Sequence, residues 1–431
     1  MKFAYGSSDF RGMIKEGSFY IDRTDKIPLL EGSKSQLFIR PRRFGKSLLL
    51  SMLENYYDVS KKDEFEKLFG HLAIGRNPTE LRNSYFILKL DFSCVDPTGT
   101  VEQIRQSMFD HINVMIEGFE RWYKYKGFEI PKITINYENA LFSLQSLAES
   151  VKATPYPIYL LIDEYDNFAN TVMMGIQILD RDYGRDTHNQ RYQSLVHEQG
   201  PLRTFFKTVK ALTTSTMFDR VFITGVSPVV MSDITSGYNV AKNIYFKDEF
   251  NALCGFTHSE VEDVIRQIVE SCKFKESKIK EAVELMRTYY NGYRFSYKAE
   301  DYIYNPTLCL YFWDGFQEYC EYPFEMLDDN LAVDESKLEY IAKIPKGQEL
   351  LLSLMDENQQ IVVPAISKRF GIQEMLDDAS KDHAFLVSFL YYFGVLTMED
   401  HTEDLQSILK VPNLVMKGII SRCLQTEITA G

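Results

Sequence analysis

A phosphate-binding loop is indicated by the stretch IRPRRFGKSLLL, which spans residues 39–50. In such a loop, backbone N–H groups and the N-terminus of the following helix face phosphate oxygens. Gly45 would let the backbone approach closely, Lys46 would bridge the β- and γ-phosphates, and Ser47 would bind Mg²⁺. The usual pattern begins with another glycine, and Arg40 holds that position here. The stretch therefore predicts a nucleotide site from the second half of the usual signature.

The other residues of this stretch are also expected to contact the nucleotide, namely Arg40, Arg42, Arg43, Phe44 and Leu48. The arginines would add cationic donors beside the phosphates. For each of them, the alternative is a salt bridge to an acidic residue elsewhere in the chain. For the stretch as a whole, the alternative is a basic turn without a ligand, because the triplet Gly-Lys-Ser is common by chance.

An acidic pair at the end of an apolar run supplies the second half of the expected site. The run YPIYLLIDEYD covers residues 156–166 and is typical of a buried strand. Asp163 would hold Mg²⁺, through water or together with Ser47, and Glu164 would orient and polarise an attacking water. A strand-end turn is the alternative for this pair alone. The two motifs in this order predict a site for a nucleoside triphosphate with Mg²⁺.

A third apolar run, RVFITGVSP at residues 220–228, also ends in polar residues. Thr224 or Ser227 would sense the γ-phosphate and position the water, and Thr224 is the candidate for a catalytic role. Ordinary capping of the strand end is the alternative. No N/T-K-x-D motif that reads guanine stands out, so the predicted nucleotide is ATP.

Short apolar runs alternate with longer amphipathic stretches, which is typical of parallel strands joined by helices. The predicted strands lie within residues 36–40, 85–93, 156–166 and 220–228, and the predicted helices cover residues 46–57, 101–121 and 201–212. This alternation predicts an α/β fold, a doubly wound parallel sheet with its site at the carboxyl ends of the strands. Residues 1–250 would form this unit, with residues 171–200 as an excursion over the site.

Residues 251–330 are predicted to form a small helical lid. The stretches 257–270 and 278–290 are helical in pattern, and Thr257 or Ser259 is a candidate N-cap ahead of Glu260. The nucleotide state is expected to change the position of this lid.

Residues 331–431 are predicted to resemble a winged-helix domain. The expected order is a helix, a short strand, two helices and a two-stranded wing, at residues 335–355, 360–365, 366–377, 382–392, 394–399 and 405–412. Winged helices often bind DNA. The wing tip at residues 399–404, however, is strongly acidic, and the helix at residues 382–392 is almost wholly apolar. Packing or protein contact is therefore expected here rather than DNA binding.

Composition and charge narrow the classes of function. The chain has 431 residues and a formal net charge of -13, which argues against an extended surface for nucleic acid. The cysteines are scattered without a C-x-x-C pair, so we expect reduced, mostly buried thiols and neither a zinc site nor a disulfide framework. No secretion signal or run of about 18 apolar residues is evident, so a cytoplasmic protein without a membrane span is expected.

The sequence resembles bacterial AAA-ATPase-like proteins that often precede a PD-(D/E)XK nuclease domain. The likeness runs from about residue 5 to about residue 415 and rests on stretches such as LFIRPRRFGKSLLLSMLENYY, YLLIDEYDNF and VFITGVSPVVMSDITSGYNVAKNI. Members of that family carry R-P-R-R-F-G-K-S in place of a full Walker A motif. The resemblance therefore implies that the altered loop is a family trait. It also implies an ATP-binding P-loop NTPase fold of the AAA/STAND type.

A PD-(D/E)XK nuclease needs an aspartate and, on a following strand, an acidic-x-Lys triplet that holds Mg²⁺. The triplets Glu276–Lys278 and Glu335–Lys337 lie in polar surroundings with a helical pattern. We therefore expect that the 431 residues do not include the nuclease domain, either because they are a fragment of a longer protein or because this member has lost the domain.

Two functions from different classes fit these motifs. The first is a Mg²⁺-dependent ATPase whose nucleotide state rearranges the lid and the winged-helix domain, and Glu164 favours it. The second is a STAND-like module that holds ATP or ADP with little turnover and acts through a protein partner or a homo-oligomer. The second is favoured by the lack of a clear arginine finger, for which Arg220 and Arg294 are the candidates. A DNA-associated role rests mainly on the nuclease domain that often follows in members of this family.

Overall fold

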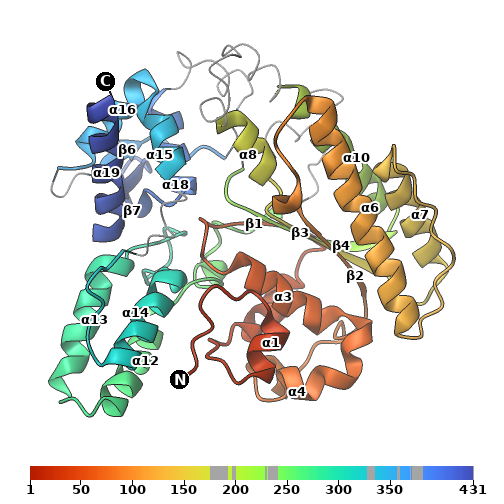
Figure 1. Ribbon diagram of the computed structural model, residues 1–431, viewed down its shortest axis with the longest axis horizontal. Helices are drawn as coiled ribbons and strands as arrows, with labels where there is room; N and C mark the ends of the chain where they lie inside the picture. Colours follow the sequence, from red (N-terminus) through yellow and green to blue (C-terminus); the bar gives the residue numbers. More distant parts are fainter. Residues whose placement is uncertain are drawn as a thin grey trace.

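The computed structural model describes residues 1–174, 193–196, 200–228, 231, 241–327, 335–356, 360–368, 370 and 382–430. A parallel sheet lies at the centre, with helices on both of its faces, and two further groups of elements pack beside it (Figure 1). Most of the expected excursion at residues 171–200, and most of the helix expected at residues 366–377, lie outside the described residues.

The central sheet confirms the expected α/β fold. Its strands are parallel and follow the order β2-β3-β4-β1-β5. The bounds are β1 (Ser35–Ile39), β2 (Phe86–Asp91), β3 (Ile158–Asp163), β4 (Phe218–Gly225) and β5 (Lys242–Asn243). Every residue of β1 and β3 is buried, because helices cover both faces of the sheet. Their apolar runs are therefore nearly continuous rather than alternating.

The register of the sheet brings the carboxyl ends of its strands together. Asp91 at the end of β2 pairs with Asp163 at the end of β3, and Ile39 at the end of β1 pairs with Gly225 at the end of β4. In doubly wound sheets, ligands bind at this edge. The loops that follow these strands therefore build the site.

The helices next to the sheet follow the predicted pattern. The helix α3 (Lys46–Tyr57) has the predicted bounds, and α6 (Val101–Tyr125) and α10 (Pro201–Thr214) each continue a few residues further than predicted. Figure 1 shows α6, α10 and α7 (Ala140–Lys152) on one side of the sheet, with α3, α1 (Phe10–Lys15) and α4 (Phe65–Phe69) on the other. The helix α8 (Asn167–Met174) follows β3 directly.

A helical group packs beside the sheet and consists of α12 (His258–Ser271), α13 (Ser277–Tyr290) and α14 (Pro306–Tyr319). Thr257 is the N-cap of α12, and Glu260 completes a capping box, so Thr257 rather than Ser259 is the cap. Each of these helices turns its apolar face toward the others, which is how amphipathic helices bury apolar surface.

The expectation that the cysteines are reduced is wrong for one pair. Cys272 at the end of α12 and Cys320 at the end of α14 form a disulfide. The two residues are 48 positions apart in the sequence, so their pairing depends on how the helix ends pack, which no local spacing reveals. The remaining thiols of Cys254, Cys309 and Cys423 are buried, and that of Cys94 is exposed.

The C-terminal group combines helices with an antiparallel sheet of order β6-β8-β7. Its elements are α15 (Glu335–Ala342), α16 (Pro345–Ser353), β6 (Ile361–Val363), α18 (His383–Tyr392), β7 (Thr397–His401), β8 (Ser407–Lys410) and α19 (Leu414–Ala430). The single helix expected at residues 335–355 is wrong. Pro345 starts a second helix, because proline has no backbone N–H with which to continue the first. The helix α19 was not predicted.

The helix α18 is a core helix, as its apolar composition predicted. Its residues from Phe385 to Tyr392 are all buried. Tyr391 and Tyr392 pack against Phe246, with ring centroids 6.1 and 6.4 Å away, and this contact joins the C-terminal group to the segment after β5. Within the described residues, no helix is long and apolar enough to cross a membrane.

Candidate nucleotide-binding site

The loop between β1 and α3 has the backbone shape that phosphate binding requires. Gly45 is the N-cap of α3 and adopts a φ of 88°, which L-residues with a side chain rarely accept. A Cβ on Gly45 would meet nothing within 4 Å, so the backbone here faces open space. The N–H groups of the first turn of α3 are not used within the helix and can bind an anion.

A cavity of about 470 Å³ opens at this loop, within the size range of small-molecule sites. Arg43, Phe44, Gly45, Lys46, Ser47, Leu48 and Glu164 line it, so most of the predicted site residues share one space. The other walls come from residues 5–8 and 19–21 near the N-terminus, residues 253–256 before α12, and Pro306, Thr307 and Leu310 of α14.

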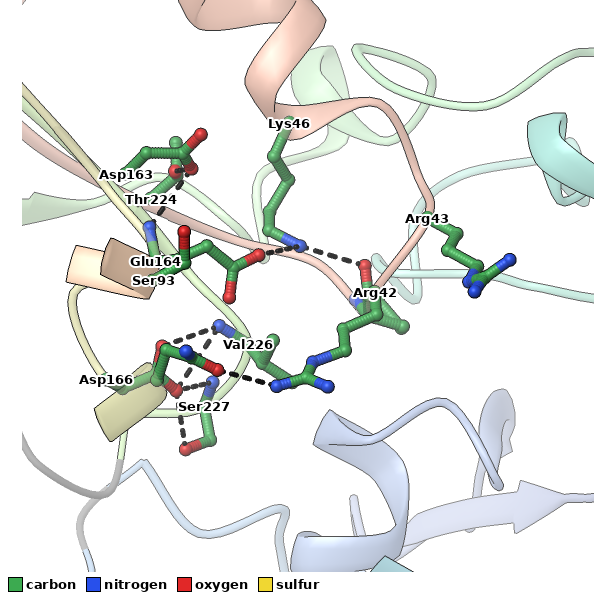
Figure 2. A network of polar contacts seen from close by, with 12 residues as sticks. Arg42, Arg43, Lys46, Ser93, Asp163, Glu164, Asp166, Thr224, Val226 and Ser227 are labelled. Atoms are coloured by element: carbon green, nitrogen blue, oxygen red, sulfur yellow. Dashed lines mark hydrogen bonds and ion pairs between the residues drawn. The ribbon is translucent and has the colours of Figure 1, made fainter. Parts of the chain in front are cut away.

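Lys46 and Glu164 meet across this cavity. The Lys46 side chain is only 3% exposed, and its Nζ donates a hydrogen bond to the Pro41 carbonyl at 3.1 Å. The same Nζ lies 3.8 Å from Glu164 Oε1. Figure 2 shows the two side chains pointing toward each other. The structure thus brings together the lysine and the glutamate that were expected at one nucleotide site, although 118 positions separate them in the sequence.

Glu164 has an unusual backbone and an unusual environment. Its φ of 49° is uncommon for a residue other than glycine, and such strain often occurs at functional sites. Burial raises the pKa of Glu164, while the nearby charges of Lys46 and Arg42 lower it. The carboxylate is therefore more basic than an exposed glutamate, as a group that accepts a hydrogen bond from water should be.

Asp163 and Thr224 form a buried pair at the ends of β3 and β4. Asp163 Oδ1 accepts hydrogen bonds from the Thr224 hydroxyl at 2.5 Å and from the Glu164 backbone N–H at 3.0 Å. Thr224 is fully buried and does not line the cavity. Its position does not support direct contact with a γ-phosphate, and it orients the Asp163 carboxylate instead.

Asp166 is a site residue that the sequence reasoning missed. Its fully buried carboxylate accepts hydrogen bonds from the backbone N–H of Val226 at 3.1 Å, the backbone N–H of Ser227 at 2.8 Å and the Ser227 hydroxyl at 3.1 Å (Figure 2). The side-chain amide of Asn170 donates another at 2.7 Å. Because its hydroxyl is bound here, Ser227 is not supported as a γ-phosphate sensor. A second acid two residues after Glu164 was the available signal.

Arg40 does not contact the cavity, which corrects its predicted role. Its guanidinium is buried and donates to the backbone carbonyls of Ile39, Tyr245 and Phe250 at 2.8 to 2.9 Å. It also lies 4.0 Å from the ring centroid of Phe295. Burial lowers the pKa of Arg40 to about 10. This arginine therefore ties the loop to the segments around it.

The other two arginines of the loop lie closer to the site. Arg42 Nη2 donates to Asn167 Oδ1 at 2.6 Å, at the start of α8, and Figure 2 shows its side chain near the end of β3. Arg43 lines the cavity with a φ of 65°, and its carbonyl accepts a hydrogen bond from Thr307 Oγ1 at 2.9 Å. The loop is thereby joined to α14 of the helical group.

The family model described as predicted AAA-ATPase matches residues 4–235, which is more than half of the chain and includes the loop between β1 and α3, Asp163 and Glu164. The chain belongs to this predicted AAA-ATPase family. The substituted loop lies within the residues that the family model matches. The expected relationship is confirmed.

The chain is also similar to one curated protein and to one solved structure. A curated protein of Azotobacter chroococcum, described as an uncharacterized protein in the vnfD 5′ region, is 24% identical over 325 residues. That match covers 74% of this chain and 53% of the relative, so the chain spans about half of the relative's length. A Walker-type ATPase of Pyrococcus abyssi has 13% identity and a TM-score of 0.50, covering 93% of this chain and 94% of that one. This likeness shows the shared fold.

Neither arginine-finger candidate of this family member faces the cavity. Arg220 lies at the opposite end of β4, where its guanidinium donates to the carbonyls of Glu31 and Ser33. Arg294 donates to the carbonyls of Ser296 and Tyr297. Both arginines hold local backbone in place, which corrects the suggestion that one of them reaches the phosphates.

The residues at the site fit a nucleotide-bound Mg²⁺ better than a metal held by protein alone. Among the described residues, no cluster of His, Cys, Asp and Glu side chains is suited to hold a metal ion. In P-loop enzymes, phosphates and water supply most Mg²⁺ ligands, with a Ser or Thr hydroxyl and one carboxylate from the protein. Ser47 in the cavity and Asp163 at the end of β3 are the donor types of that set, although Asp163 is buried and does not itself line the cavity.

Proposed function

We propose that the protein is a Mg²⁺-dependent ATPase that binds ATP in the 470 Å³ cavity between the loop and the helical group. The observation that carries the proposal is the approach of Lys46 and Glu164 within that cavity, directly beside the N-terminus of α3. A basic turn without a ligand would have no need of a strained, partly buried glutamate beside a buried lysine.

The residues divide the work of phosphoryl transfer between them. Bound ATP would supply the phosphoanhydride bond, and Mg²⁺ would neutralise part of the phosphate charge. Gly45 and the first turn of α3 present N–H groups to phosphate oxygens. The Lys46 ammonium group leaves the Pro41 carbonyl and binds phosphate oxygens instead. Ser47 and Asp163 hold the cation. Glu164 accepts a hydrogen bond from the attacking water and orients it.

In this proposal residues 251–330 act as a lid and residues 331–431 as a winged-helix-like domain, and both respond to the nucleotide. The loop contacts each of them. Phe44 packs edge-on against Tyr293 and Phe295, with ring centroids 4.9 and 5.4 Å away. A Cβ on Gly394, next to α18, would lie 2.9 Å from Pro41 Cβ, so the C-terminal group touches the loop itself.

A STAND-like module with little turnover is the second candidate. It is favoured by the positions of the two arginine-finger candidates, since the guanidinium groups of Arg220 and Arg294 donate to backbone carbonyls elsewhere. Under this candidate the nucleotide state would be read by a protein partner or a second copy of the chain. A DNA-associated role is the weakest candidate, because the acidic wing tip would repel a phosphate backbone.

Single-turnover hydrolysis in wild type and Glu164→Gln separates the first two candidates. The glutamine keeps the shape of the side chain and removes its charge, so ATP and Mg²⁺ should bind with little change. The rate should fall by ~10²–10³, as when one transition-state group is lost. Glu102→Gln on the exposed surface of α6 is a matched control and should hydrolyse ATP at the wild-type rate. Equal rates in wild type and Glu164→Gln would favour the module with little turnover. Adding duplex DNA to the wild type tests the third role.

A further inference from the structure

A second cavity, of about 270 Å³, lies on the same side of the sheet as α3 but apart from the loop. Its walls come from α1, α3, β2 and the short helix η2 (Val59–Glu64). The lining is charged in both signs and includes Asp9, Arg11, Glu54, Asn55, Lys61 and Lys89. Ser8 lines both this cavity and the nucleotide cavity, so the two are neighbours.

Asn55 lies in the wall of this second cavity and has an unpaired side-chain acceptor. Its side chain is 95% buried, with 5% exposed, and its Nδ2 donates to the Ser51 carbonyl at 2.8 Å. Among the described residues, no donor reaches Asn55 Oδ1. A buried carbonyl oxygen without a partner is costly, so such an atom in the wall of a cavity points to a ligand that donates a hydrogen bond.

Lys61 is the cation of the cavity that is not used in a contact ion pair. Arg11 forms a bidentate pair with Glu64, and Lys89 lies 3.3 Å from Glu54. Lys61 is only 9% exposed and lies 5.1 Å from the ring centroid of Trp122. Within the described part of the chain, no carboxylate oxygen is found within 4.0 Å of its Nζ. Burial lowers the pKa of Lys61.

We propose that this cavity binds a small zwitterion of the amino-acid class. The carboxylate of such a ligand would pair with Lys61, and its ammonium group would donate to Asn55 Oδ1 and approach Glu54. A simple anion would face the carboxylates of Asp9 and Glu54, and a simple cation would face Lys61 and Lys89. A molecule with both charges would pair with Lys61 at one end and donate to Asn55 Oδ1 at the other, so that neither of these buried groups is left without a partner.

The helix α3 connects this site to the nucleotide cavity. Its Ser47 lines one cavity, and its Ser51, Glu54 and Asn55 line the other. Eight residues of helix separate Ser47 from Asn55, a rise of about 12 Å. The two cavities therefore lie along one helix.

Calorimetric titration of the full chain with the free amino acids, sodium acetate and methylammonium chloride tests the proposal. At least one amino acid should bind, and acetate and methylammonium should bind at least tenfold more weakly. Lys61→Met should weaken that binding at least tenfold, whereas Lys62→Met, on the exposed side of η2, should leave it unchanged. Glu54→Gln, a change at a partly exposed residue, is a second variant that should also weaken it.

Three outcomes would overturn the zwitterion site: no binding of any amino acid, acetate binding as well as the amino acids, or equal binding by wild type and Lys61→Met. The result does not depend on the ATPase proposal. Lys46→Ala should retain amino-acid binding even though it removes nucleotide binding, so the two proposals fail separately.

Discussion

At the scale of single residues, the site depends on a buried lysine and a partly buried glutamate that compensate each other. Lys46 Nζ lies 3.8 Å from Glu164 Oε1, and both side chains are largely shielded from water. A charge in such surroundings is costly unless an opposite charge is near. Removing either side chain therefore leaves the charge of the other without its partner.

We expect Lys46→Ala to abolish nucleotide binding, because it removes the charge that faces the β- and γ-phosphates. The loss should exceed a hundredfold in the dissociation constant, measured with a fluorescent ATP analogue. Lys62→Ala on the surface is the matched control and should bind normally. If folded Lys46→Ala protein still bound ATP with micromolar affinity, the assignment of this loop as the phosphate site would be wrong.

The pH dependence of hydrolysis should report the environment of Glu164. Burial raises its folded pKa above the ordinary value of 4.5, and only the ionised form accepts a hydrogen bond from water well. Activity should therefore fall with decreasing pH at a higher pH than an exposed glutamate would cause. Arg42 lowers this pKa, so Arg42→Ala should move the acidic limb of the kcat/KM profile to still higher pH. An unshifted limb in Arg42→Ala would show that Glu164 does not control it.

At the scale of elements, Asp166 holds the turn after β3 against the turn after β4. Its carboxylate accepts from two backbone N–H groups and a hydroxyl on the β4 side, and from Asn170 on α8. Glu164 lies between Asp163 and Asp166, and both of these anchors constrain its backbone. The strained φ of Glu164 is thus maintained by neighbouring elements, as strain at functional sites requires.

We expect Asp166→Asn to lower the free energy of unfolding by about 2–4 kcal/mol, since an amide cannot accept all the hydrogen bonds of a buried carboxylate. Urea denaturation followed by circular dichroism measures this effect. Turnover should fall more than nucleotide affinity does, because the loop from β1 to α3 is not altered. A variant as stable and as active as wild type would contradict this role.

At the scale of the whole molecule, the C-terminal group touches the loop between β1 and α3. Gly394 has a φ of 80°, and a Cβ there would lie 2.9 Å from Pro41, whose carbonyl accepts the Lys46 hydrogen bond. A movement of the C-terminal group would therefore be transmitted to Lys46 through Pro41 alone. The contact supplies a direct route for the proposed coupling.

We expect Gly394→Ala to destabilise the fold by about 1–3 kcal/mol and to weaken ATP binding by about tenfold, because its methyl group displaces Pro41. Gly418→Ala in α19 is the control: its methyl group meets nothing within 4 Å, and alanine favours a helix, so stability should stay equal or rise. Thermal unfolding and ATP titration of both variants measure the two effects. If Gly394→Ala lost stability but kept wild-type ATP affinity, the contact would be structural only.

Local patterns in the sequence determined the elements of the sheet and the types of residue at the site. Each of the four predicted strands and the helix α3 was found, because apolar runs and a glycine before a helix act over a few neighbouring residues. The grouping of Lys46, Ser47 and Glu164 around one cavity followed from the general rule that parallel strands end at a common edge.

Only the tertiary structure decided which polar groups face the cavity and which are used elsewhere. Arg40 and Arg42 are two residues apart in the same loop, yet Arg40 binds buried carbonyls and Arg42 reaches the start of α8. The same holds for the Cys272–Cys320 disulfide and for Asp166, whose partners lie 48 and about 60 positions away. A residue's type states what it can bind, but its partner is set by packing between segments distant in the chain, and no local pattern encodes that.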